Sequence, residues 1–196
     1  TIKSWLGAEG EAALRAGLGR PLNFVSMLEG RFKFRPKDGP AEIPKFRSVG
    51  DGAYKDGLLP HNYGRLGLSA PLNQNQLRRL KNSLTLEKSR PVLVLGTGEF
   101  LHPPYRLARM LEDDGFEVTF ASTTRTPVAL GHIIGSVMRF ADNYHDGIDN
   151  FLYNVPPESD SQKIICYETP HLPDGHDLAA RLGAQTVFFG APHGAA

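Results

Sequence analysis

The sequence predicts an α/β fold built on a Rossmann-like parallel sheet of about four or more strands, with helices on both faces. Two observations lead to this fold class. The second half of the chain holds apolar runs of strand length, at residues 92–95, 116–121, 163–167 and 186–189. Segments with helix signals lie between these runs, and strands that alternate with helices form parallel sheets with right-handed crossovers. The continuous apolar runs agree, because parallel strands are usually covered on both faces.

The helices are predicted from the signals at their ends. Residues 103–114 begin with two prolines, which suit a first helical turn, and are followed by a glycine that ends the helix. Thr126 precedes another proline, so we expect an N-cap there and a helix that continues to about residue 140. A short helix is expected within residues 174–183, where the last residue is again glycine.

The domain organisation follows from a change of composition near residue 90. Residues 1–90 are rich in Gly, Pro, Lys and Arg, and we expect an irregular segment packed on the core. Residues 91–196 are expected to form one compact α/β ligand-binding core. Within the first part, apolar spacing predicts a helix at 72–86, and an alternating pattern predicts a strand at 31–35. A short helix is also expected at 8–16, where Gly17 ends it.

Composition argues against several function classes. The 22 basic and 21 acidic residues give a net charge of +1, which produces no field that would attract nucleic acid or an acidic membrane. No apolar run approaches the roughly 18 residues of a membrane span. The one cysteine, Cys166, cannot form an intramolecular disulfide, which suits a reducing compartment. We therefore predict a cytoplasmic domain that binds neither nucleic acid nor membranes.

The loops after the strands are the candidate site, because open α/β sheets bind ligands outside the carboxyl ends of their strands. Gly96, Thr97 and Gly98 follow the first strand and would present backbone amides to an anion. The alternative, favoured for these three residues alone, is a tight strand-to-helix turn. A dinucleotide-binding fingerprint is not present, because Leu101 stands where its third glycine would be.

The loop after the second strand is the more specific cluster. Thr123, Thr124, Arg125 and Thr126 combine three hydroxyl groups with a guanidinium, whose planar fork suits phosphate or carboxylate. Free amides at the start of the expected helix would favour the same anion. The structural alternative is an N-cap beside one surface arginine.

A long polar segment at residues 139–150 supplies a third group of candidates. It would contact a sugar or base, or hold Mg²⁺ through an aspartate, although the sequence requires no metal and shows no zinc motif. In the alternative, the Asp and Asn side chains satisfy their own turns. A calcium loop is rejected, because tyrosines occupy two of its ligand positions. The candidate residues are Arg139, Asp142, Asn143, Tyr144, Asp146 and Asn150.

Two carboxylates lie at predicted strand ends and are the candidates for acid–base chemistry, Glu99 and Glu168. Arg65, in a glycine-rich part of the first half, is a further candidate for the ligand edge, with a structural ion pair as its alternative. Cys166 lies inside a strand, and we expect it to be buried and inert.

Several of these segments together resemble the TRSP domain, a family named for a Thr-Arg-Ser-Pro motif. The matching residues are LGTGEFLHPP at 95–104, STTRTP at 122–127, RFADNYHDG at 139–147 and NFLYN at 150–154. Residues 57–68 also resemble its N-terminal part, so the likeness covers most of the chain. Thr126 replaces the serine of the motif and keeps its hydroxyl.

The resemblance implies a function. Domains of this family lie C-terminal to a phosphoribosyltransferase-like domain in bacterial tellurite-resistance and stress-response clusters, which are thought to make a nucleoside-like metabolite. A chain that begins at Thr1 fits a piece of such a fusion. We therefore expect a domain that binds a phosphorylated sugar or nucleotide-like ligand as part of a phosphoribosyltransferase-type enzyme.

Two alternatives stay open at this point. The first is a non-catalytic module that docks on the phosphoribosyltransferase domain or on a second copy of itself, forming a homodimer. The second is a hydrolase in which Glu99 or Glu168 activates water.

Overall fold

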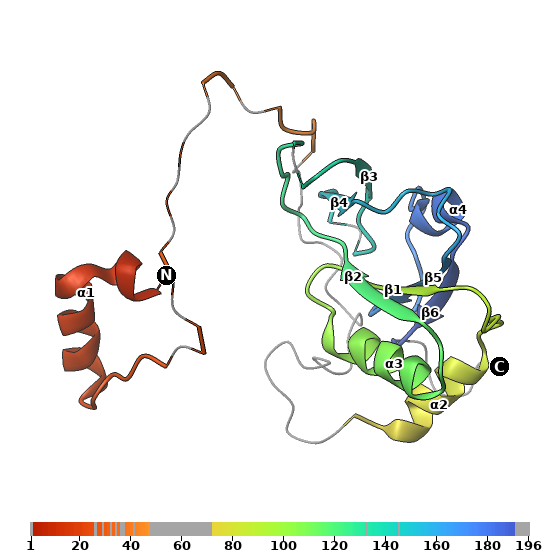
Figure 1. The fold of residues 1–196 in the computed structure, drawn as a ribbon, viewed down its shortest axis with the longest axis horizontal. Helices are drawn as coiled ribbons and strands as arrows, with labels where there is room; N and C mark the ends of the chain where they lie inside the picture. Colours follow the sequence, from red (N-terminus) through yellow and green to blue (C-terminus); the bar gives the residue numbers. More distant parts are fainter. Residues whose placement is uncertain are drawn as a thin grey trace. The chain divides into compact units, whose positions relative to one another are not determined.

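The structure is a computed structural model that describes residues 2–25, 27–28, 30–31, 33, 35, 38–40, 42–47, 72–131, 133–144 and 146–190 (Figure 1). The chain divides into two units, Thr1–Gly39 and Pro40–Ala196, and each is described by itself. Arg65 and the segment around it lie outside the described residues, as do His132 and His145.

The first unit contains helix α1, Ile2–Leu18, which confirms the helix predicted at 8–16 and starts earlier. Gly7 interrupts it with a φ of 63°, so two helical segments meet there at a kink. The strand predicted at 31–35 is wrong for its described residues, since Arg31, Lys33 and Arg35 lie in no strand. An alternating sequence forms a strand only when a neighbouring strand pairs with its amides.

Four strands of the second unit form one parallel sheet, as predicted. They are β1 (Val92–Gly96), β2 (Val118–Ser122), β5 (Gln162–Tyr167) and β6 (Gln185–Phe188). Their order across the sheet is β2-β1-β5-β6. Val94 of β1 stands opposite Phe120 on one side and Ile164 on the other. Because all four strands are parallel, their carboxyl ends share one edge of the sheet.

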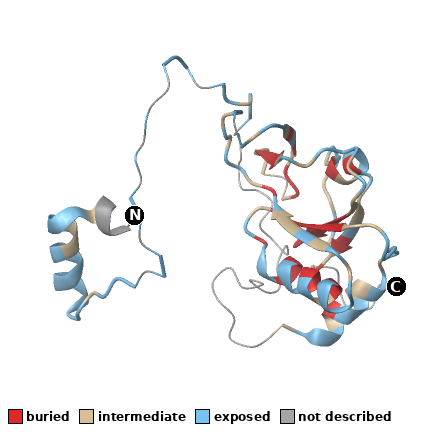
Figure 2. Cartoon of the chain, in the orientation of Figure 1, coloured by how far each residue is buried: buried red, intermediate tan, exposed pale blue. Residues whose placement is uncertain are grey.

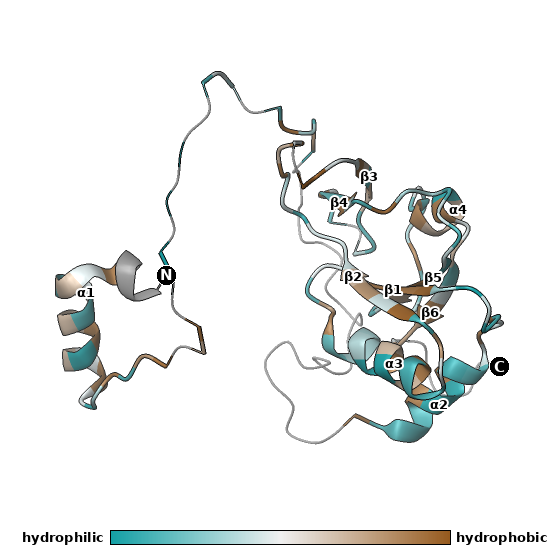
Figure 3. Ribbon diagram, viewed as in Figure 1, coloured by the Kyte–Doolittle hydropathy of each residue, from teal (hydrophilic) through white to brown (hydrophobic). Residues whose placement is uncertain are grey.

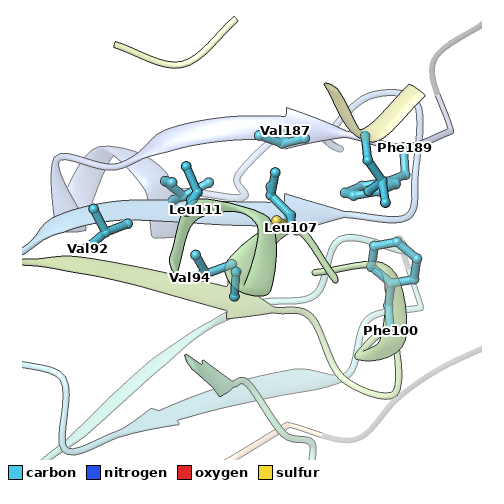
Figure 4. Close-up of a cluster of buried hydrophobic side chains, with 11 residues drawn as sticks. Val92, Val94, Phe100, Leu107, Leu111, Val187 and Phe189 are labelled. Atoms are coloured by element: carbon cyan, nitrogen blue, oxygen red, sulfur yellow. The ribbon is translucent and has the colours of Figure 1, made fainter. Parts of the chain in front are cut away.

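One face of the sheet is covered by α2 (Gln74–Asn82) and α3 (His102–Asp113). Leu107 and Leu111 of α3 lie against Val92 and Val94 of β1, and all four side chains are almost completely buried (Figure 4). The buried colours of Figure 2 and the hydrophobic colours of Figure 3 follow the strands and the inner side of α3. The outer side of α2 is hydrophilic.

The opposite face is covered by α4 (Leu178–Leu182) and by a two-stranded antiparallel hairpin, β3 (Val137–Ala141) and β4 (Asp149–Tyr153). Leu93 and Leu95 point to this side and belong to a second core. The hairpin and α4 contribute the remaining members, which include Met138, Phe140, Leu152, Leu178 and Leu182. The predicted helices on both faces are therefore confirmed, with the hairpin as an additional layer on one of them.

The helix predicted from Thr126 to about residue 140 is wrong. Residues 127–130 are irregular and residues 137–141 form β3, whose side chains are alternately buried and less buried. Gly131 has a φ of 141°, a conformation that a helix does not contain. The pairing of β3 with β4 and the burial of Met138 and Phe140 in the second core outweigh the local Thr-Pro helix signal.

The ends of the other helices follow their sequence signals. Pro103 and Pro104 occupy the first turn of α3, and Gly183 ends α4 in the left-handed conformation with a φ of 58°. Asn73 caps α2 by accepting hydrogen bonds from the amides of residues 75 and 76, so this helix is shorter than the predicted 72–86. Among the described residues, no helix is long and apolar enough to cross a bilayer.

The close approach of Gly190 to the loop after β5 provides a test of this packing. A Cβ atom at Gly190 would lie 2.3 Å from the carbonyl oxygen of Glu168 and 3.0 Å from the nitrogen of Pro170. We expect Gly190→Ala to lower the free energy of unfolding by about 1–3 kcal/mol, because backbone atoms must move to relieve the overlap. Urea denaturation followed by circular dichroism measures this change.

Gly135→Ala is the matched control, since its Cβ would meet nothing closer than the Asn154 side chain at 3.9 Å. It should change the free energy of unfolding by no more than about 0.5 kcal/mol. Equal stability of the two variants would show that the 168–170 loop does not pack on Gly190 in solution.

Candidate functional site

The loop after β1 is a tight turn that ties three strands together. Gly96 has no room for a side chain, because a Cβ atom there would lie 2.6 Å from the carbonyl oxygen of Phe100. Thr97 is fully buried, and its hydroxyl donates to the carbonyl oxygen of Cys166 in β5 at 3.1 Å. The Gly98 amide donates to Thr123 Oγ1 at 2.9 Å. The triplet therefore has the geometry of the structural alternative, and the Gly98 amide is engaged within the protein.

The threonines after β2 are also held by backbone contacts. Thr123 is buried, and its amide donates to the carbonyl oxygen of Gly96 at 3.0 Å. Thr124 and Phe151 of the hairpin exchange two backbone hydrogen bonds, of 2.9 and 2.7 Å. Thr124 Oγ1 accepts from the amide of Thr126 at 3.1 Å. Both hydroxyl oxygens accept from the protein, which leaves the hydroxyl hydrogens of Thr123 and Thr124 to donate.

Thr126 does not cap a helix, in contrast to the sequence interpretation. Its carbonyl oxygen accepts from the hydroxyl of Tyr153 at 3.1 Å, and the same hydroxyl accepts from the amide of Val128 at 2.6 Å. The helix dipole that was expected to favour an anion at this loop is consequently not available, and the cation of Arg125 becomes the main electrostatic feature.

Arg125 lies across the end of the hairpin loop. Its Nη2 donates to Asp146 Oδ2 at 2.7 Å, and its Cζ lies 5.7 Å from the centre of the Tyr144 ring. The Arg125 side chain is 43% exposed, whereas that of Asp146 is 19% exposed. A guanidinium has five N–H donors, so this ion pair uses only part of its capacity.

Tyr144 connects the hairpin loop to the end of β5. Its hydroxyl donates to Glu168 Oε2 at 2.7 Å, and Glu168 is fully buried. The other candidate carboxylate, Glu99, is exposed. The structure thus brings Arg125, Tyr144 and Glu168 together from three separate loops. The acid–base role of either glutamate stays a prediction.

The remaining polar candidates in this segment organise the hairpin loop itself. Asp142 is buried, and its carboxylate accepts from the amides of Tyr144, Asp146 and Ile148 at 2.6, 3.0 and 3.1 Å. Asn150 Nδ2 donates to the carbonyl oxygen of Ile148 at 3.2 Å. These are the turn contacts of the alternative interpretation, and they hold the loop in one conformation.

Arg139 is placed elsewhere on the hairpin. Its Nη1 donates to the carbonyl oxygen of Lys45 at 3.1 Å and lies 3.5 Å from Asp149 Oδ2. Asp149 also accepts from the amide of Arg47, so this group joins residues 45–47 to β4. A ligand contact for Arg139 stays a prediction.

Metal ligation has little support in the described part of the chain. No group of three or more His, Cys, Asp or Glu residues there is arranged to hold a metal ion. The two aspartates suggested for Mg²⁺ are engaged, Asp142 with backbone amides and Asp146 with Arg125. Cys166 is completely buried, which confirms the expected burial, and this burial raises the pKa of its thiol.

Sequence reasoning missed a contact between the sheet and the hairpin that involves His176. Its Nδ1 lies 2.8 Å from the carbonyl oxygen of Ala141 and its Nε2 lies 2.7 Å from the Tyr167 hydroxyl. A carbonyl only accepts, so Nδ1 carries a proton, and in the neutral ring Nε2 accepts from Tyr167. No local signal identifies these partners, because Tyr167 and His176 meet only through the fold of the loop between them.

This histidine predicts a pH dependence of stability. Burial lowers the pKa of His176 below its ordinary value of 6.5, although the carbonyls of Ala141 and Asp142 and the carboxylates of Asp177 and Asp142 oppose that shift. The unfolded chain therefore binds the proton more readily than the folded protein does. The contribution of His176 to stability is complete above pH 6.5 and falls as the pH is lowered from there toward the folded pKa.

We expect the free energy of unfolding to decrease between about pH 7.5 and about pH 5.5, and to decrease less in the His176→Gln variant. Urea denaturation at several pH values measures both curves. Parallel curves for the two proteins would mean that His176 titrates alike in the folded and unfolded states.

Comparison with known proteins supplies a family. The model of the family described as "TRSP domain C terminus to PRTase_2" matches residues 62–182, which is more than half of the chain. No curated protein and no solved structure matches the chain significantly. The family description associates such domains with a phosphoribosyltransferase domain. This agrees with the motifs at 95–104, 122–127 and 139–154, and the chain belongs to the TRSP domain family.

Proposed function

We propose that this domain binds a phosphorylated sugar or nucleotide-like ligand at the carboxyl edge of its parallel sheet. The observation that carries the proposal is the contact network of Arg125, Tyr144 and Glu168 at that edge. The edge is the usual ligand position of open α/β sheets. In the proposal, the domain acts with a phosphoribosyltransferase domain in making a nucleoside-like metabolite, in the setting of tellurite and stress resistance.

Arg125 is the proposed phosphate-binding residue. It is the exposed cation of the network, and its planar fork matches two phosphate oxygens. The hydroxyl hydrogen of Thr124 is a further donor in the same loop, since its oxygen already accepts from the protein, whereas the Thr123 side chain is buried. In the proposal, these groups neutralise and orient the phosphate without any proton transfer.

Asp146 competes with the phosphate for Arg125 in this proposal. It forms an ion pair with Arg125 at 2.7 Å, so an incoming phosphate competes with a carboxylate for the same guanidinium. The pair keeps Arg125 in one orientation over the Tyr144 ring but lowers its attraction for anions. Removal of the Asp146 charge should therefore strengthen phosphate binding.

The family association supports the choice of ligand. A phosphoribosyltransferase handles a phosphorylated ribose, and a companion domain with an arginine at its sheet edge is suited to the same class of molecule. We propose that this chain supplies ligand binding, and that the chemistry occurs together with the transferase domain.

Calorimetric titration with ribose 5-phosphate, with and without Mg²⁺, tests the proposal. We expect Arg125→Ala to weaken binding by about tenfold or more, because charge-assisted hydrogen bonds to the phosphate are lost. The affinity of Arg125→Lys should lie between those of Arg125→Ala and the unmodified protein, since lysine keeps the charge and loses the planar fork. Asp146→Asn should bind more tightly than the unmodified protein.

Arg109→Ala is the matched control for these titrations. Arg109 is an exposed arginine on α3 that pairs with Glu112 and Asp113, so its loss removes one positive charge away from the site. It should leave affinity unchanged. An equal decrease in Arg109→Ala and Arg125→Ala would indicate binding by net charge alone, and no binding by the unmodified protein would refute the proposal.

A docking module is the second candidate, and one observation favours it. Three apolar side chains of the first unit are almost fully exposed, with Val25 at 92%, Met27 at 103% and Leu28 at 91%. Large apolar groups exposed so close together are typical of interaction surfaces. The occupant that we propose for this segment is the phosphoribosyltransferase domain.

Co-purification with a phosphoribosyltransferase domain of the PRTase_2 family tests this candidate. Replacing Val25, Met27 and Leu28 by serine should abolish the complex, because the apolar contact area is lost. Serine at Leu14 and Leu18, which are 39% and 54% exposed on α1, serves as the control and should preserve it. A complex that survives the first set of changes would exclude this segment as the docking surface.

A further inference from the structure

Residues 42–47 form a segment without helix or strand that is attached to the hairpin β3–β4 and to the loop beside it. Backbone carbonyl oxygens at both ends of this segment and within it accept hydrogen bonds from those elements. The pairs are the Leu130 amide with Glu42 at 3.3 Å, Arg139 Nη1 with Lys45 at 3.1 Å, and the Asp149 amide with Arg47 at 2.9 Å. The 42–47 segment is therefore held along its whole length.

The C-terminal end of the segment also partners a buried carboxylate. The side chain of Asp149 in β4 is 7% exposed, and its Oδ2 accepts a hydrogen bond from the amide of Arg47. Arg139 Nη1 lies 3.5 Å from the same oxygen. A buried charge is costly unless it is paired, so this contact with the segment stabilises Asp149 in its place in β4.

Phe46 extends the attachment to the aromatic side chains of β4. Its ring packs edge-to-face against the Phe151 ring, with 6.4 Å between the ring centres. Phe151 is fully buried, and the Tyr153 ring stacks on it at 6.0 Å. Aromatic pairs stabilise a structure beyond the area that they bury. Three rings in contact therefore connect the 42–47 segment to the far end of β4.

The same strand holds the loop that carries Arg125. Phe151 and Thr124 exchange two backbone hydrogen bonds, and the Tyr153 hydroxyl donates to the carbonyl oxygen of Thr126 at 3.1 Å. The residues on both sides of Arg125 are thus fixed by β4. A continuous series of printed contacts runs from Phe46 through β4 to the 124–126 loop.

The orientation of this loop matters for the proposed phosphate contact. A guanidinium binds two phosphate oxygens only when its planar fork points at both of them. A binding group that is held loosely loses affinity even though every atom is still present. The contacts that fix the 124–126 loop are therefore as important to Arg125 as its charge.

We infer that Phe46 is a positioning residue for Arg125: the 42–47 segment holds β4, and β4 keeps the 124–126 loop in the orientation that binds phosphate. The inference rests on the proposed function, in which Arg125 binds the phosphate of the ligand. It makes the affinity of the site depend on the attachment of a segment that lies far from Arg125 in the sequence.

Amide hydrogen exchange of the whole chain tests the attachment without any ligand. Phe46→Ala should speed the exchange of the Thr124 and Phe151 amides about three- to tenfold, because the ring contact that holds β4 is lost. Phe46→Leu keeps an apolar contact with Phe151 and should cause a smaller increase. The amide of Val94, in the centre of the sheet, should exchange at an unchanged rate.

Calorimetric titration with ribose 5-phosphate tests the effect on the site. Phe46→Ala should weaken binding about three- to tenfold in the otherwise unmodified chain. In the Arg125→Ala background the same change should have little further effect, because Phe46 acts through Arg125. A role of Phe46 in general stability alone would not produce this difference, so equal losses in the two backgrounds would overturn the inference.

Tyr105→Ala is the matched control. Tyr105 is 46% exposed, against 49% for Phe46, and its ring packs edge-to-face on Phe120 at 5.7 Å, outside the hairpin. This change should leave both the exchange of the Thr124 amide and the affinity for ribose 5-phosphate unchanged. Thermal melting shows whether each variant is folded.

The outcomes separate the inference from the proposed function. A folded Phe46→Ala with unchanged exchange at Thr124 and Phe151, or with full affinity for ribose 5-phosphate, overturns the inference and leaves the proposed function intact. Failure of the unmodified protein to bind ribose 5-phosphate refutes the proposed function, and the inference with it.

Discussion

Both faces of the parallel sheet are apolar and must be buried by other elements, and the rest of this structure depends on that constraint. Leu93 and Leu95 point to one side of β1, and Val92 and Val94 to the other, so each strand brings apolar side chains to two surfaces. Helices α2 and α3 bury the first surface. The short helix α4 is too small to bury the second by itself, and the hairpin β3–β4 supplies the remaining contacts.

The packing of the hairpin against the sheet also forms the candidate site. Its backbone pairs with Thr124 at the end of β2, and its loop reaches β5 through Tyr144 and Glu168. His176 joins Ala141 at the end of β3 to Tyr167. The same packing that completes the second core therefore carries polar side chains to the edge of the sheet. The proposed binding at this edge therefore depends on contacts that also hold the hairpin on the sheet.

The charged groups at this edge of the sheet differ in how far they are exposed. Arg125 and Asp146 form a partly exposed pair, and the buried Glu168 accepts a hydrogen bond from the Tyr144 hydroxyl. In the proposed function, Arg125 is the group at this edge that binds the phosphate of the ligand. The family description, which places such domains C-terminal to PRTase_2, is a second support for the proposed class of ligand.

The sequence by itself determined the four parallel strands, the ends of α3 and α4, and the placement of Arg125 and Glu168 at the strand ends. These features follow from local properties, namely continuous apolar runs and proline or glycine at helix ends. Only the tertiary structure decided that residues 137–141 form a strand, because that outcome depends on pairing with β4 and on burial against Leu93 and Leu95. The contacts of Glu168 with Tyr144 and of His176 with Ala141 could not be predicted from the sequence either, because they form only when separate segments pack together.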